Sequence, residues 1–157
     1  MSNTRLQPMV EWRHINWRKL ERRVFKLQKR IFQASIRGDV ERVHKLQRLL
    51  IKSKSATLLA VRRVTQDNAG KKTAGVDGLS SLKPHQRLKL AQKLQSEPTS
   101  PSAQPVRRIW IPKPGKTELR PLGIPVIEER ARQALVKIAL EPEWEARFEA
   151  NSHGFRP

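Results

Sequence analysis

The segment RRIWIPKPGKTELRPLGIP, residues 107–125, contains two short apolar or β-branched runs separated by the turn-forming pair Pro114-Gly115. This pattern predicts a β-hairpin with strands over residues 106–111 and 119–124. Prolines in or beside both runs restrict them to sheet edges or strand ends, because proline donates no hydrogen bond to a ladder. A small antiparallel element is therefore expected late in the chain.

Two cations, Lys113 and Arg120, flank the expected turn. If the two strands pair around that turn, both side chains lie near its base. A stiff hairpin that holds two cations could clamp a polyanion such as a triphosphate. The residues alone leave open the alternative of an ordinary solvated hairpin tip.

Upstream of the hairpin, the sequence predicts a helical N-terminal half. Asn16 can cap a helix whose apolar residues recur every three or four positions until Gly38 ends it. Asp39 can cap a second helix antiparallel to the first. A third helical stretch is expected over residues 55–65.

The remaining sequence alternates between loops and short elements. Three glycines interrupt the helical pattern after residue 66, and three prolines mark a later linker. A last helix is expected over residues 128–140, with Pro142 breaking or restarting it, and with Trp144 and Phe148 anchoring a final turn into a core. The expected divisions are a tail at 1–15, a basic helical segment at 16–66, a glycine-rich loop at 67–80, a short helix at 81–96, a linker at 97–105, and the hairpin with its helix at 106–157.

The chain is strongly basic. It holds 33 Lys and Arg against 14 Asp and Glu, a net charge of +19 over 157 residues. Residues 1–75 contain 19 of these cations and only five of the acids. Such a field favours a polyanionic partner, and nucleic acid is the commonest one; a solvated basic surface is the alternative. The contact with a polyanion is expected mainly in the N-terminal half.

The first expected helix carries its cations away from its apolar stripe, with Glu21 as the only acid among them. Cations one helical turn apart can follow a phosphate backbone and release its counterions. Two further basic pairs flank the start of the glycine-rich loop, whose backbone amides could meet phosphates; a plain surface turn is the alternative there. The candidate nucleic-acid contacts are Arg18, Lys19, Arg22, Arg23, Lys26, Lys29, Arg30, Arg62, Arg63, Lys71 and Lys72.

No residue of the sequence can be nominated as catalytic or as a metal ligand. Asp39, Asp67 and Asp77 are the only aspartates and none pairs with another, whereas polymerases need convergent carboxylates to hold two divalent ions. Cysteine is absent, and the four histidines lack ligand spacing. Neither a signal peptide nor a run of 18 apolar residues is present, so a cytoplasmic protein with no membrane partner is expected.

Several of these segments resemble the N-terminal part of group II intron reverse transcriptases, also called maturases. WRKL at residues 17–20, with the two basic helices, is similar to the extension that grips intron RNA in this family. Residues 59–78 resemble the segment before the polymerase fingers, whose loop covers the template strand. IPKP at 111–114 with LRPLGIP at 119–125 is the most specific match. NSHGFRP at 151–157 is similar to the next fingers motif, where the family usually has Tyr in place of His153.

This resemblance implies an α+β fold, in which a mostly helical, basic N-terminal half precedes a hairpin and a helix of the right-hand polymerase fingers type. It implies that Lys113 and Arg120 would contact the triphosphate of an incoming dNTP. The implied function is that of the RNA-binding N-terminal portion of an RNA-directed DNA polymerase involved in RNA splicing and intron mobility. Intron RNA or another structured RNA would be the partner.

In the family the metal-binding aspartates lie farther along, in the palm. The chain is therefore expected to be truncated or split before the palm and inactive alone, without a cofactor. Mg²⁺ is expected only in a full-length relative, and a separate palm-containing fragment is a further possible partner. Two alternatives stay open: a stand-alone, non-catalytic RNA-binding or splicing-helper module, and a non-functional remnant.

Overall fold

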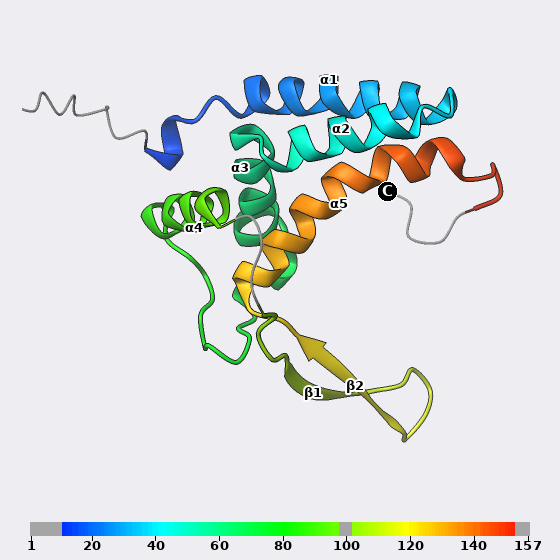
Figure 1. Ribbon diagram of the computed structural model, residues 1–157. Helices are drawn as coiled ribbons and strands as arrows, with labels where there is room; N and C mark the ends of the chain where they lie inside the picture. Colours follow the sequence, from blue (N-terminus) through cyan, green and yellow to red (C-terminus); the bar gives the residue numbers. More distant parts are fainter. Residues whose placement is uncertain (1–10, 98–101, 153–157) are drawn as a thin grey trace, which may run out of the picture.

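In the computed structural model, which describes residues 11–97 and 102–152, helices dominate and a two-stranded hairpin precedes the last of them. The α+β class expected from the sequence is confirmed. The expected tail, linker and 151–157 motif fall partly outside the described residues. The elements are η1 (Trp12–His14), α1 (Trp17–Ile36), α2 (Val40–Ile51), α3 (Lys54–Arg62), the π-helical turn η2 (Arg63–Asp67), η3 (Ala69–Lys72), α4 (Pro84–Ser96), β1 (Arg107–Pro112), β2 (Leu119–Ile124) and α5 (Ile127–Arg147), as Figure 1 shows.

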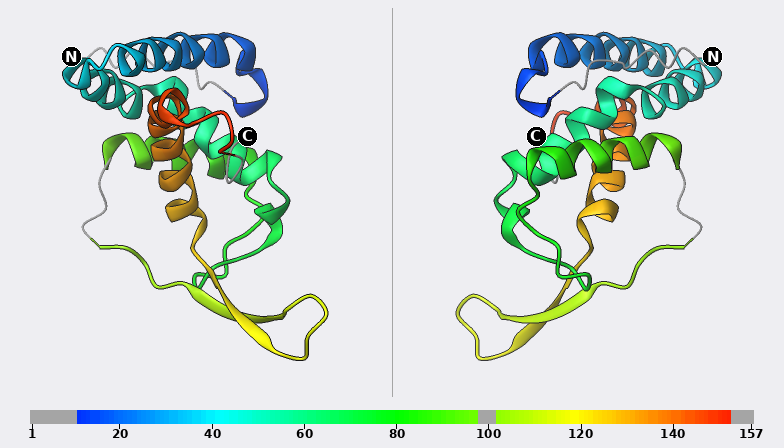
Figure 2. Two further views of the ribbon diagram at one scale, coloured as in Figure 1. Left: turned by 90° about the vertical axis from the view of Figure 1, so that its right-hand side faces the viewer. Right: turned by 90° about the vertical axis from the view of Figure 1, so that its left-hand side faces the viewer.

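The side chains expected as caps fix the starts of α1 and α2. The Asn16 side chain accepts a hydrogen bond from the Lys19 backbone N–H at 3.1 Å, and Asp39 accepts one from the Arg42 N–H at 3.0 Å. Between the helices Gly38 has a φ of 70°, a left-handed conformation that favours glycine. The chain therefore reverses sharply, and α1 and α2 lie side by side in opposite directions (Figures 1 and 2).

The main core lies where α1, α2, α3 and α5 meet. Ile31, Val43 and Leu50 are completely buried there, and burial of each such side chain stabilises the fold by about 1.5–3 kcal/mol. A second cluster packs Trp12 and Val61 against α4 and α5. The basic N-terminal helices and the late helix α5 thus share one core, although most of the chain separates them.

Helix α5 continues through Pro142 to Arg147, so the expectation that Pro142 breaks it is wrong. Proline removes one N–H from the helix and leaves the carbonyl four residues earlier, that of Ile138, without its helical partner. Gln28 of α1 replaces that partner, because its Nε2 donates to the Ile138 carbonyl at 3.0 Å. The proline is therefore tolerated through a contact from another helix.

Trp144 and Phe148 are not anchored in a core, contrary to expectation: their exposed fractions are 46% and 44%. Their ring centroids lie 6.4 Å apart, and the Arg147 guanidinium sits 5.4 Å from the Trp144 ring centre. Val136 and Leu140 are also exposed and precede Trp144 at intervals of four residues. These four apolar side chains form an exposed stripe along α5 and its C-terminal end.

The hairpin projects from the helical body (Figures 1 and 2). Its register pairs Arg107 with Ile124 and Pro112 with Leu119, in agreement with the expected strands. At its root the glycine-rich loop passes very close: a Cβ on Gly75 would lie 2.8 Å from the Val126 Cα. No helix within residues 11–97 and 102–152 has both the length and the apolar character needed to cross a membrane.

Candidate nucleic-acid interface

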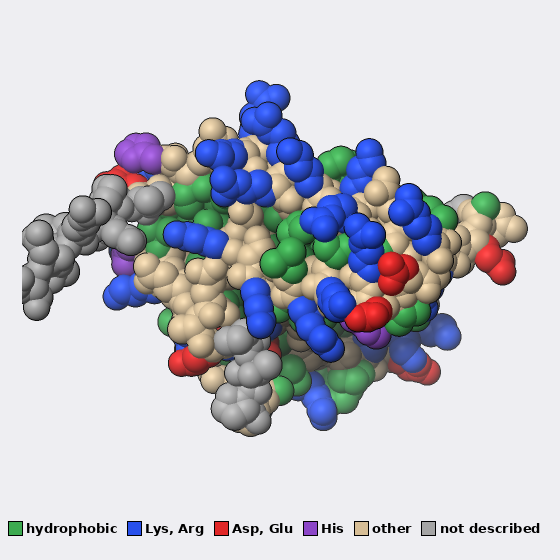
Figure 3. Space-filling model, turned by 45° about the horizontal axis from the view of Figure 1, so that its top comes forward, with side chains coloured by type: hydrophobic (Ala, Val, Ile, Leu, Met, Phe, Trp, Pro, Cys, Tyr) green, Lys and Arg blue, Asp and Glu red, His purple; other side chains and the backbone are tan. Residues whose placement is uncertain are grey.

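The outer surface of α1 carries a set of cations that we call the basic face. All of its members are exposed, and none forms an ion pair with a carboxylate in the part of the chain that the structure describes. Glu21, the acid among them, pairs instead with Arg62 of α3 at 3.4 Å. Figure 3 shows Lys and Arg gathered on this side of the molecule with few acids between them. The members of the basic face are Arg18, Lys19, Arg22, Arg23, Lys26, Lys29 and Arg30.

Arg62 is separate from the basic face, although the sequence grouped it with the same candidates. Its Nη1 lies 3.4 Å from Glu21 and its Nε 3.6 Å from Asp67, while its guanidinium stacks 4.8 Å from the Trp17 ring centre. The contacts with Glu21 and Trp17 fasten α1 to α3. The charge of Arg62 is thus shared with two carboxylates, whereas its neighbour Arg63 is exposed and has no carboxylate partner among the described residues.

The glycine-rich loop holds Lys71 and Lys72 differently. Lys71 is half-buried and its Nζ donates to the Gln66 carbonyl at 2.7 Å, while Lys72 is exposed at the end of η3. Arg130 of α5, which the sequence gave no reason to select, fixes this loop by donating to the Gly70 carbonyl at 2.9 Å and to the Thr73 carbonyl at 2.6 Å. Burial lowers the pKa of Arg130, which Asp77 partly offsets. The loop is thereby tied to the start of α5.

Three neighbouring hollows lead away from the edge of the basic face. The first, of about 550 Å³, is bordered by Arg18, Arg22 and Phe25 on α1. The second, of about 320 Å³, lies between α1, α3 and α5 and is lined by Phe25 and Arg63 among others. The third, of about 600 Å³, lies between η2 and α5. The first and second hollows share Glu21 and Phe25, and the second and third share Arg63.

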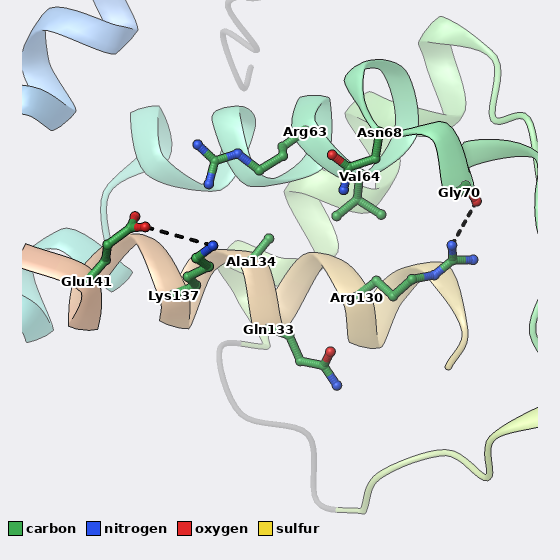
Figure 4. Close-up of a pocket in the computed structure, with 9 residues that line it drawn as sticks. All are labelled: Arg63, Val64, Asn68, Gly70, Arg130, Gln133, Ala134, Lys137 and Glu141. Carbon is green, nitrogen blue, oxygen red and sulfur yellow. Dashed lines mark hydrogen bonds and ion pairs between the residues drawn. The ribbon is translucent and has the colours of Figure 1, made fainter. Parts of the chain in front are cut away.

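Figure 4 shows the third hollow, in which Arg63, Asn68 and Lys137 surround the side chains of Val64 and Ala134. Val64 and Ala134 are buried and give the hollow an apolar floor. The Lys137 ammonium lies 3.8 Å from the Glu141 carboxylate, so part of its charge is compensated. The hollow combines an apolar floor with a basic wall.

The hairpin holds Lys113 and Arg120 on one face. Arg120 pairs with Ile111, and Lys113 follows that residue by two positions, so both cations lie on the same side next to the turn. The Lys113 Nζ lies 2.6 Å from the Glu118 carboxylate. Both cations lie next to the turn of the hairpin, on a different part of the molecule from α1 and its basic face (Figure 1).

The described residues do not fit a divalent metal site. Asp39 caps α2, Asp67 lies beside Arg62, and Asp77 accepts a hydrogen bond from the Leu79 N–H at 3.1 Å. Within residues 11–97 and 102–152, no group of three or more His, Asp or Glu side chains is placed to hold a metal ion. No chemical step is therefore assigned to a metal in this part of the chain.

Comparison with known proteins finds relatives of the region that contains the basic face and the glycine-rich loop. Residues 12–94 fit the family model described as the N-terminal domain of reverse transcriptase. Maturase-like protein 1 of Euglena gracilis is 36% identical over 140 residues, which cover 89% of this chain and 30% of the relative. Protein YkfC of Escherichia coli K12 is 39% identical over 119 residues, 74% of this chain and 30% of the relative. The group II intron-encoded protein LtrA of Lactococcus lactis subsp. cremoris is 41% identical over 95 residues, 57% of this chain and 15% of the relative. The chain spans less than a third of the length of these relatives.

Proposed function

The chain belongs to the family of reverse transcriptase N-terminal domains, and we therefore propose that it is the RNA-binding N-terminal portion of a group II intron reverse transcriptase or maturase. The names of two relatives, a maturase-like protein and a group II intron-encoded protein, support a structured intron RNA as its partner. Its function would accordingly lie in RNA splicing and intron mobility.

The observation that carries this proposal is the basic face of α1. Seven exposed cations lie on one rigid helix without carboxylate partners among the described residues. A cation that is already paired must give up its partner before it can bind a phosphate, whereas an unpaired one only releases the counterions of the RNA. The basic face is therefore suited to the phosphate backbone of RNA.

Salt dependence of binding tests this assignment. Replacing Arg22, Arg23, Lys26 and Arg30 together by Ala should flatten the plot of log affinity against log salt by about three, since each phosphate contact adds roughly 0.7–0.9. The probe is a structured group II intron RNA fragment, and affinity is measured by filter binding between 50 and 300 mM salt, concentrations chosen to cover the usual screening range.

The matched control removes the same amount of charge from exposed residues outside the basic face, by replacing Lys89, Arg107, Arg108 and Lys116 with Ala. This control should lower affinity only slightly and leave the slope nearly unchanged. Equal effects of the two quadruple variants would mean that net charge, and not the basic face, attracts RNA.

We also propose that residues 1–157 do not synthesise DNA by themselves. The aspartates that they contain do not converge, and two-metal polymerase chemistry needs carboxylates that do. A palm, in the same protein or in a separate fragment, would supply that site together with Mg²⁺. In such an assembly Lys113 and Arg120 would contact the nucleotide triphosphate.

A further inference from the structure

The three hollows beside α1, η2 and α5 lie next to one another, and we refer to them together as the groove. Phe25 borders the first and the second hollow, and Arg63 borders the second and the third. The groove therefore leads from the edge of the basic face, past α3, to the glycine-rich loop. Glu21 and Phe25 lie between the first and second hollows, and Arg63 lies between the second and third.

Phe25 is placed as a stacking platform. Its exposed fraction is 64%, and it shares the first hollow with Arg18, Arg22 and Glu21, whose carboxylate is paired with Arg62 at 3.4 Å. An exposed aromatic side chain by itself is common on protein surfaces. Beside Arg18 and Arg22 and at the border of two hollows, however, its ring can receive an unpaired base while these guanidiniums bind the adjoining phosphates.

Arg63 is placed to hold the backbone at the middle of the groove. It is exposed and without a carboxylate partner among the described residues, unlike Arg62 beside it. It opens the π-helical turn η2, a type of distortion often found at functional sites. Beyond it, the third hollow has the buried floor of Val64 and Ala134 and the amide of Asn68 at its wall. A flat ring can lie on such a floor, and an amide can hydrogen-bond to its edge.

We propose that this groove holds an unpaired strand of RNA. One base stacks on Phe25, the backbone passes Arg63, and a later base enters the hollow over Val64 and Ala134. The inference rests on the proposed function and specifies it further: the basic face holds the phosphates of a structured RNA, and the groove takes a single strand that extends from it. A duplex cannot use the groove in this way, because its bases are stacked on one another inside the helix.

The test compares two labelled RNA probes, a uridine 10-mer and a blunt duplex hairpin, by fluorescence anisotropy. Phe25→Ala should weaken binding of the uridine 10-mer by roughly 5- to 100-fold, whereas Phe25→Trp should preserve it, because stacking depends on an aromatic surface. Duplex binding by both variants should stay within about twofold of the wild type. The control is Ile36→Ala, since Ile36 is an equally exposed apolar residue of α1, at 63%, that lines none of the three hollows.

A second pair of variants tests the middle of the groove. Arg63→Ala should weaken binding of the uridine 10-mer and lower its salt slope by about 0.7, the value for one phosphate contact on a single strand. Arg108→Ala removes the same charge from the exposed hairpin strand and should leave the slope unchanged. Circular dichroism should show equal helix content in all of these variants.

The outcomes separate this inference from the proposed function. If Phe25→Ala and Arg63→Ala bind the uridine 10-mer like the wild type while the quadruple basic-face variant loses RNA, the groove is not an RNA site and the proposed function stands. If Phe25→Ala weakens duplex and single strand equally, the specificity for an unpaired strand is refuted. If the single-strand loss appears but the quadruple variant binds normally, the groove stands at Phe25 and Arg63, while the basic face, including Arg22, is wrongly assigned. If the wild type binds the intron RNA fragment but not the uridine 10-mer, the groove inference falls and the proposed function stands; if it binds none of these RNAs, both fall.

Discussion

The basic face of α1 and the tip of the hairpin both present cations, but the fold holds them in opposite ways. The helix lies on a core shared with α2, α3 and α5, and its cations have no carboxylate partners within the described residues. The hairpin stands away from the body, and its Lys113 is paired with Glu118. The first arrangement favours constant attraction of a long polyanion. The second favours a contact that Lys113 makes only with an anion able to displace Glu118.

The largest effect is expected at the hairpin once a palm is joined to it. In a fusion of a relative's palm after Pro157, Lys113→Ala or Arg120→Ala should reduce kcat/KM for dNTP by up to about 100-fold, because each removes a fixed cation from the transferring phosphates. Arg120→Lys should also be impaired if the contact is bidentate. Steady-state primer extension measures these values, and residues 1–157 alone should give no product.

Two controls belong to that experiment. Lys116→Ala, at the turn, should be mild, and RNA affinity should not change in any of these variants. If both substitutions weaken RNA binding while dNTP kinetics stay normal, the two cationic regions share one function and the contrast between them disappears.

The hairpin root gives the next effect. Gly75→Ala should destabilise the protein by about 1–3 kcal/mol, since the new methyl group would meet the backbone of Val126 at 2.8 Å and force the loop and the root apart. Gly70→Ala is the control, because its Cβ would lie at an ordinary contact distance of 3.5 Å from Arg130. Urea denaturation measures both; equal stabilities would show that the loop does not brace the hairpin.

A somewhat smaller effect is expected where α1 supports α5. Gln28→Ala should cost about 1–2 kcal/mol, because the Ile138 carbonyl loses the donor that replaces the missing N–H of Pro142. In a Pro142→Ala background the residue at 142 regains its N–H, and Gln28→Ala should then cost little. A double-mutant cycle by urea denaturation measures this coupling. Additive effects would mean that Gln28 stabilises the fold in some other way.

The smallest effect concerns Glu128 of α5, which forms ion pairs with Lys93 of α4 and with Arg132 of α5 itself. Burial by itself would raise the pKa of Glu128, but the hydrogen bonds and positive charges of Lys93 and Arg132 outweigh it and leave this pKa below its ordinary value. A carboxylate with a lowered pKa in the folded state stabilises the protein above its unfolded pKa, and this contribution is lost as the pH falls through the folded value. Glu128→Gln should therefore cost at most about 1 kcal/mol at pH 7, since the group is partly exposed.

The difference between Glu128→Gln and the wild type should shrink as the pH falls below the ordinary Glu value of 4.5 and then through the lower pKa of the folded protein, where the wild-type carboxyl becomes neutral. Thermal unfolding across this pH range measures it. A difference that stays constant with pH would assign the effect to packing and not to charge.

The sequence predicted those features that depend on neighbouring residues. Asn16, Asp39 and Gly38 mark helix boundaries through local hydrogen bonds and backbone conformation, and the Pro114-Gly115 pair marks the turn. The basic face also follows from helical periodicity alone. Its binding of RNA, like the role of the hairpin cations, stays a prediction.

The sequence could not predict features that join distant segments. Pro142 looks like a helix breaker until Gln28, 110 residues before Ile138, supplies the hydrogen bond. Arg130 looks like an ordinary surface cation, although it binds two carbonyls of a loop almost 60 residues earlier. The groove is also invisible in the sequence, because Phe25 and Arg63 lie on different helices that only the tertiary fold brings together.

The contact between Gln28 and Ile138 has a consequence for how the chain folds during its synthesis. A ribosome adds about 5–20 residues per second, so α1 is made several seconds before the part of α5 that packs on it. During that interval the cations of α1 are already present, while its apolar side has no α5 to cover it. A nascent chain would thus expose the cations of α1 before α5 completes the core.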